Sequence, residues 1–228
     1  MPTGTIGILW DVDGTLVDTA EQHFLAWAQL SREIGRPFTR ADFARTFGWR
    51  NPEIVRELYA PNADDAKCLA IGERKETLYR EMVRTTGATL LPGVRELLAA
   101  FASEGIPQAV GSSAPRGNLD LLLNATGIAN DFAAIVSGED VTRGKPDPEV
   151  FLTGAAGIGV EPRRCVVFED AIAGVQAARR GGMACIAVTF VGHHPAEKLR
   201  EAGADRIVAS LAEVTVSQVR ELIESRAR

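Results

Sequence analysis

The feature that constrains this chain most is a short apolar run near its beginning that ends in two aspartates. Residues Ile6 to Trp10 are apolar, and the next five residues read Asp-Val-Asp-Gly-Thr. A short apolar run before a glycine-containing break is typical of a buried strand. We therefore expect Asp11 and Asp13 just past the carboxyl end of that strand, where open α/β sheets hold their ligands.

The two carboxylates leave two interpretations open. Aspartates one residue apart repel each other unless a cation or shared protons offset their charge. They could be solvated side chains of an Asp-Gly turn, or they could be a magnesium-binding nucleophile and a neighbouring acid/base. The rest of the chain has to distinguish between these interpretations.

Hydrophobic periodicity predicts a helical insert within an α/β domain. Between residues 19 and 87 only helical patterns occur, and they predict four helices. After residue 91, helical patterns alternate with short apolar runs near 106–111, 135–136, 165–168, 184–188 and 206–208, as in βαβ units. We expect a doubly wound, mostly parallel, Rossmann-like α/β core formed by residues 1–17 and 88–228, and an inserted four-helix cap domain formed by residues 18–87.

Composition and charge exclude several classes of function. The 228 residues are 46% hydrophobic and carry a formal net charge of −5, which argues against general affinity for nucleic acid or anionic membranes. Three cysteines are too few and too far apart for a disulfide framework or a zinc site. No apolar window approaches the length of a membrane span. We expect a cytoplasmic monomer without nucleic-acid or membrane partners.

Three further stretches place polar residues at expected strand ends or in stiffened loops. Ser112 and Ser113 follow one expected strand and precede a helix, where hydroxyl and amide groups could hold an anion or merely cap the helix. Lys145 lies in a loop stiffened by two prolines, so its ammonium group could be aimed by the backbone, although an isolated lysine in such a loop is more often a solvated surface residue. Glu169 and Asp170 follow another apolar run and form a second carboxylate pair.

Together these stretches specify one site. Parallel sheets bring the ends of separate strands together, and magnesium prefers oxygen ligands such as carboxylates. In their order along the chain, the four stretches resemble the four motifs of the haloacid dehalogenase superfamily of phosphotransferases. The helical insert is similar to the cap of the subfamily that contains β-phosphoglucomutase, phosphoglycolate phosphatase and sugar-phosphate phosphatases.

This resemblance implies a role for each core residue. Asp11 would be the nucleophile that forms an aspartyl-phosphate, and Asp13 the acid/base that protonates the leaving alcohol and then activates water. Mg²⁺ would be held by the Asp11 carboxylate, the Asp13 main-chain carbonyl and Asp170, with support from Glu169. Ser112 and Lys145 would neutralise the phosphoryl oxygens.

The cap and the second motif supply the candidates for substrate binding. The resemblance to the β-phosphoglucomutase cap implies roles for Thr19, His23 and Lys75, and Arg50 lies near the position of the mutase's cap arginine. In the second motif, Ser113 is a candidate, and Arg116 is either a phosphate contact or a surface residue at a helix start.

The same resemblance leaves three functions open. The mutase has a serine and a lysine, which help to bind a second phosphate, where this chain has Ala114 and Pro115. We therefore expect a magnesium-dependent phosphatase of a small phosphorylated metabolite, with a sugar phosphate as the first choice. The alternatives are a hexose-phosphate mutase and a catalytically silent domain that binds a phosphorylated ligand.

Overall fold

The apolar run at the start of the chain forms the central strand of a parallel sheet. The computed structural model describes residues 5–226, and within them six strands pair in the order β3-β2-β1-β4-β5-β6. The strands are β1 (Gly7–Trp10), β2 (Gln108–Gly111), β3 (Ala134–Val136), β4 (Cys165–Glu169), β5 (Ala184–Val188) and β6 (Arg206–Val208). All five pairings are parallel. This strand order is that of a doubly wound fold, so the expected fold class is confirmed.

Helices cover both faces of the sheet. They are α5 (Val94–Ser103), α6 (Arg116–Thr126), α7 (Glu149–Gly157), α8 (Ile172–Arg180), α9 (Ala196–Ala202) and α10 (Val216–Arg226). Successive side chains of a strand point to opposite faces. Accordingly, Ile8 and Trp10 pack in the cluster that includes α5, α6 and α10, whereas Leu9 packs in the cluster of α7, α8 and α9. With both faces covered, β1 is fully buried, which explains its unbroken apolar sequence.

Strand register brings the polar residues of separate motifs together. Trp10 pairs with Val110 of β2 and with Phe168 of β4. The residues that follow these partners in the chain therefore lie side by side at the carboxyl edge of the sheet. The Asp11 main-chain N–H donates to the Phe168 carbonyl at 3.0 Å, which continues the pairing one residue further. This edge is the position at which doubly wound sheets bind ligands.

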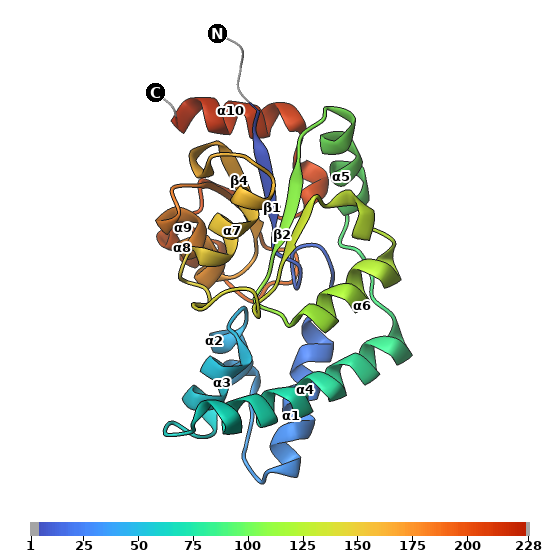
Figure 1. The fold of residues 1–228 in the computed structure, drawn as a ribbon, viewed down its shortest axis with the longest axis vertical. Helices are drawn as coiled ribbons and strands as arrows, with labels where there is room; N and C mark the ends of the chain where they lie inside the picture. The colour runs from blue at the N-terminus through green and yellow to red at the C-terminus, as the bar shows by residue number, and fades with distance from the viewer. Residues whose placement is uncertain (1–4, 227–228) are drawn as a thin grey trace.

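Four helices between β1 and α5 form a separate layer at this edge of the sheet (Figure 1). They are α1 (Ala20–Glu33), α2 (Arg40–Thr46), α3 (Asn51–Leu58) and α4 (Asp65–Thr86), and we call them the cap helices. Their apolar faces pack together, with the Trp27 ring stacked on Tyr59 at a centroid distance of 5.7 Å. The Tyr59 hydroxyl is bonded to Ser31 Oγ at 2.7 Å, so this buried polar group is satisfied.

The four helices expected between residues 19 and 87 are therefore present. The separation of this segment as a domain, with boundaries at residues 17 and 88, remains a prediction. Helix α9 lies between β5 and β6, which continues the alternation of strands and helices expected after residue 91. Within residues 5–226, no helix is long and apolar enough to cross a bilayer.

Candidate active site

The edge of the sheet holds a buried cluster of charges around Lys145. The Lys145 ammonium donates to Asp11 Oδ1 at 2.6 Å and to Glu169 Oε1 at 2.8 Å. Glu169 Oε2 in turn accepts the main-chain N–H groups of Asp170 at 2.8 Å and Ala171 at 2.6 Å. Removing one partner of such a buried pair leaves an uncompensated charge, which costs about 3–5 kcal/mol. Lys145 is thus fixed beside the carboxylate of Asp11.

Asp170 differs from its neighbours because its carboxylate has no hydrogen-bond partner among residues 5–226. Both of its oxygens are buried and accept no hydrogen bond within the described part of the chain. The Asp170 carboxylate lies close to the main chain at Gly14. A residue with a side chain would not fit there, because a Cβ built at this glycine would lie 2.3 Å from Asp170 Oδ2. A buried polar group without a partner is rare and indicates a ligand at that position.

The carboxylates fit a divalent cation. Asp11, Glu169 and Asp170 each offer an oxygen, and these oxygens lie within 4.8 Å of one another. Burial raises the pKa of the Asp11 carboxyl to about 8 against the opposing effect of Lys145, and the Glu169 charge contributes to the rise. Burial and the neighbouring Glu169 and Asp11 also raise the pKa of Asp170 well above its ordinary value. A hard cation bound by these oxygens would offset the repulsion and favour the ionised carboxylates.

Asp13 lies on the other side of the site and contacts the cap helices. Its Oδ1 accepts hydrogen bonds from the Thr19 hydroxyl and from His23 Nε2, the latter at 3.1 Å. Lys75 Nζ lies 2.7 Å from His23 Nδ1, so the lysine donates to Nδ1 and the imidazole presents an Nε2 proton to Asp13. Burial alone would raise the pKa of Asp13, but the His23 and Thr19 contacts hold it below its ordinary value.

The second motif contributes Ser112, which is 2% exposed. Ser112 Oγ accepts the Ala114 main-chain N–H at 3.1 Å, and its hydroxyl proton is available for an anion. Ser112 and Ser113 line a cavity together with Asp11 and Asp13. Two of the four motifs therefore line one cavity, and Lys145 of the third motif reaches it through its hydrogen bond to Asp11.

Most of the remaining lining comes from the cap helices and from the loop between α2 and α3. The helices contribute His23, Trp27, Phe43, Asn51, Lys75 and Glu76, and the loop contributes Phe47 and Trp49. We refer to Asp11, Ser112, Lys145, Glu169 and Asp170 as the core side of the site, and to His23, Lys75 and Glu76 as the cap side. Asp13 lies between the two sides.

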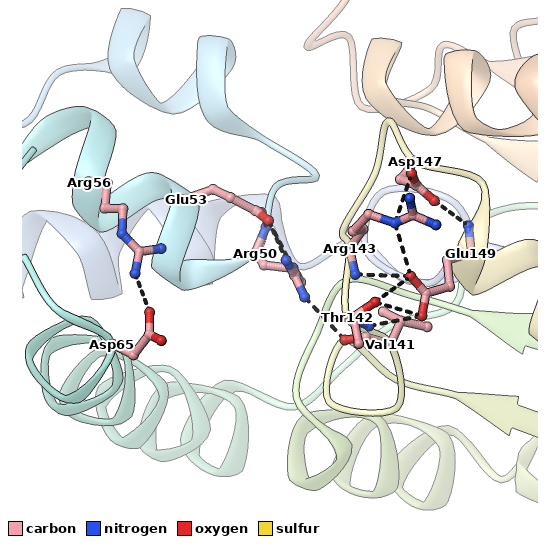
Figure 2. A network of polar contacts seen from close by, with 9 residues as sticks. All are labelled: Arg50, Glu53, Arg56, Asp65, Val141, Thr142, Arg143, Asp147 and Glu149. Carbon is pink, nitrogen blue, oxygen red and sulfur yellow. Dashed lines mark hydrogen bonds and ion pairs between the residues drawn. The ribbon is translucent and has the colours of Figure 1, made fainter.

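Three predicted substrate-binding residues have other surroundings. Thr19 is fully buried and donates to Asp13, so it positions the carboxylate. Arg50 is bonded to Glu53 at 2.6 Å and reaches the Val141 carbonyl at 3.3 Å, which links α3 to the loop that carries Lys145 (Figure 2). Arg116 is not brought to the cavity, because its exposed guanidinium pairs with Asp120 one helical turn further along α6.

Sequence reasoning missed two buried cap residues next to Lys75. Glu76 accepts a hydrogen bond from Lys75, and the Tyr79 ring stacks on His23 at a centroid distance of 3.9 Å. Tyr79 is four residues after Lys75 and so lies on the same face of α4, which is a signal that the sequence contained. Glu76 carried no comparable signal, because adjacent charges in a helix are usually solvated.

Comparisons with known proteins agree with this architecture. A family model for haloacid dehalogenase-like hydrolases matches residues 7–182. β-Phosphoglucomutase of Bacillus subtilis (strain 168) is 32% identical over 221 residues, which cover 94% of this chain and 93% of that protein. Validoxylamine A 7'-phosphate phosphatase of Streptomyces hygroscopicus subsp. limoneus is 32% identical over 209 residues, which cover 90% of this chain and 94% of that protein.

The fold is also that of a solved structure. β-Phosphoglucomutase from Clostridium difficile matches with a TM-score of 0.87 at 24% identity, over 98% of this chain and 99% of that chain. The family model covers most of the sequence, and the two relatives align along nearly their full lengths. The chain therefore belongs to the haloacid dehalogenase-like hydrolase family, in the subfamily of β-phosphoglucomutase and phosphoglycolate phosphatase-like proteins.

Proposed function

We propose that this phosphoric monoester hydrolase is a magnesium-dependent phosphatase of a small phosphorylated metabolite, and that it works through an aspartyl-phosphate on Asp11. The observation that carries the proposal is the cluster around Asp11. Lys145 binds one oxygen of this carboxylate at 2.6 Å, and the unpartnered Asp170 lies close by. Phosphoryl transfer requires mainly positioning and charge stabilisation, and this cluster supplies both.

In the proposed reaction Asp11 attacks phosphorus and the bond from phosphorus to the leaving oxygen breaks. Asp13 donates a proton to that oxygen, and the resulting carboxylate then takes a proton from the water that hydrolyses the aspartyl-phosphate. The low pKa of Asp13 suits the second step. The first step requires the protonated form, which like-charge repulsion from a bound phosphate dianion would favour.

Asp11, the Asp13 main-chain carbonyl and Asp170 would hold Mg²⁺, and Glu169 would support it through its hydrogen bonds to the Asp170 and Ala171 amides. When bound, the ion would offset the negative charge of the phosphoryl oxygens and of the carboxylates. Ser112 and Ser113 would bind the phosphoryl oxygens at the start of α6.

For the substrate, we propose a sugar phosphate. The cavity combines aromatic side chains with hydrogen-bonding groups such as Asn51 and Glu76, which suits a ring that carries hydroxyl groups. The second candidate is a hexose-phosphate mutase, which the similarity to β-phosphoglucomutases favours. Against it, Ala114 and Pro115 in the cavity offer neither a hydroxyl nor an ammonium group for a second phosphate.

A phosphate-release screen tests the proposal. The purified protein is stripped of metal, then assayed on an aryl phosphate, phosphorylated sugars and small phosphorylated acids, with and without added Mg²⁺. We expect release that requires Mg²⁺ and is lost in Asp170→Asn, whereas the surface variant Asp120→Asn behaves like the parent protein. If no ester on the panel is turned over while phosphorylated ligands still bind, the chain is a silent binding domain.

A further inference from the structure

Glu76 lies where the site cavity meets a second cavity. The second cavity lies between helices α3 and α4 and two loops of the core, and its lining includes Arg50, Glu73 and Glu139. Asn51, Glu76, Ser113 and Pro115 line both cavities. The two cavities are therefore adjacent, and Glu76 lies at their junction.

The Glu76 side chain is a fixed and buried carboxylate. It is 3% exposed, and its Oε1 accepts hydrogen bonds from Lys75 at 3.0 Å and Asn51 at 2.7 Å. Its Oε2 accepts one hydrogen bond, from Asn118 of α6 at 2.6 Å, and a carboxylate oxygen can accept a second. Burial would raise the pKa of Glu76, but Lys75 and the two amides hold it below its ordinary value, so the side chain stays charged.

The positive charges around these cavities are already paired. Within residues 5–226, the lysine and arginine side chains that line either cavity are Lys75 and Arg50. Lys75 is bonded to Glu76 itself, and Arg50 to Glu53 at 2.6 Å. The second cavity is also lined by the carboxylates of Glu73 and Glu139. A second phosphate in this region would meet negative charge without a free cation to offset it.

We propose that Glu76 determines substrate specificity by accepting a hydrogen bond from a hydroxyl group of the leaving alcohol and by repelling a second phosphate. The inference rests on the proposed function and makes it narrower, because it assigns the enzyme to monophosphates of polyhydroxy compounds and excludes bisphosphates. Glu76 would thus attract monophosphates through a hydrogen bond to a hydroxyl group and repel bisphosphates through its negative charge.

A charge exchange across the bond between Glu76 and Asn118 tests this inference. Asn118 lines neither cavity, and its Oδ1 accepts from Arg80 at 3.2 Å. The double variant Glu76→Gln/Asn118→Asp keeps the net charge and a hydrogen bond between the two side chains, with donor and acceptor exchanged. The carboxylate moves away from the cavities to a position beside Arg80. The single variant Glu76→Gln and the control Glu81→Gln, an exposed glutamate of α4 that lines neither cavity, complete the set.

The measured quantity is the ratio of kcat/KM for a hexose 1,6-bisphosphate to that for the matching hexose monophosphate. We expect this ratio to rise about tenfold or more in both Glu76 variants, because one buried like charge is removed. We expect a change of less than about twofold in Glu81→Gln, because its carboxylate is exposed and lies outside both cavities, so solvent screens its charge. Thermal unfolding of each variant shows whether its fold is retained.

Two results overturn the inference. The first is an unchanged ratio in the folded Glu76 variants when the parent protein does release phosphate from hexose monophosphates. The proposed function would then stand, but Glu76 would have no role in specificity. The other needs no variant: the bisphosphate inhibits the parent protein more tightly than the monophosphate does. Absence of phosphate release from every monoester contradicts the proposed function itself, and so the two failures are distinguishable.

Discussion

The core side and the cap side of the site are positioned in different ways. Asp11, Ser112 and Glu169 lie at the ends of three neighbouring strands, so main-chain register alone brings them together. His23 and Lys75 come from two helices, and a network of partly buried side-chain hydrogen bonds holds them in place. The positions of the proposed catalytic groups therefore depend on the main-chain fold, whereas the positions of the groups proposed for substrate selection depend on particular side-chain contacts.

The core side should show the largest effect of a single change. We expect Asp11→Asn to abolish phosphate release, because a neutral amide neither attacks phosphorus nor binds a cation as well as a carboxylate does. Rapid acid quenching of the parent protein, followed by mass spectrometry of its peptides, should place the phosphoryl group on Asp11. Phosphorylation of any other residue would remove Asp11 from this role.

Asp13 lies between the two sides, and its replacement should separate classes of leaving group. In Asp13→Asn we expect a loss of about a hundredfold or more with a sugar phosphate. The loss should be smaller with an aryl phosphate, because a phenolate leaves without needing a proton. Initial rates on both substrates measure this difference. Equal losses on the two would contradict the proposed acid role.

The difference between the sides matches how much each could be predicted. Asp11, Glu169 and Asp170 follow apolar runs that local sequence reveals, and the parallel sheet then determines where they meet. Glu76 and Asn118 contact each other across 42 positions of the chain. No local pattern predicts such a contact, because it depends on how α4 packs against α6. The same limit explains Arg116, whose surroundings depend on which way the first turn of α6 faces.

Limited proteolysis tests whether the cap helices and the α/β core are separate domains. At the two places where the cap helices join the core, the end of α4 and the residue after it (84–87) are exposed, whereas Val17 and Thr19 are fully buried. We expect the first cut near residues 86–92, because proteases select exposed backbone. N-terminal sequencing of the first fragments locates the cut. A first cut within β4 would contradict the proposed boundary.

The smallest effect concerns the loop that carries Lys145 (Figure 2). Glu149 accepts the main-chain N–H groups of Thr142 at 3.0 Å and Arg143 at 3.1 Å, and with the Thr142 hydroxyl these lower its pKa to about 2. Because the pKa of Glu149 is lower in the folded state than its ordinary value of 4.5, its ionised carboxylate stabilises the fold at pH values above 4.5. This stabilisation is lost as the pH falls towards 2.

We therefore expect Glu149→Gln to be less stable than the parent protein at neutral pH, with a difference that shrinks as the pH falls. Urea unfolding of both proteins at neutral pH and at about pH 3 measures it. The exposed control Glu161→Gln should show little change at either pH. A difference that stays constant with pH would contradict this role for Glu149.

We expect water, and not a second sugar hydroxyl, to accept the phosphoryl group from Asp11. Phosphorus NMR tests it directly by following a hexose 1-phosphate or 6-phosphate with the protein, Mg²⁺ and a trace of hexose bisphosphate. Inorganic phosphate and both isomers are resolved in the same spectrum. We predict that phosphate accumulates with little exchange between the 1- and 6-phosphates. Exchange of the isomers that outruns phosphate release would contradict the phosphatase and identify a mutase.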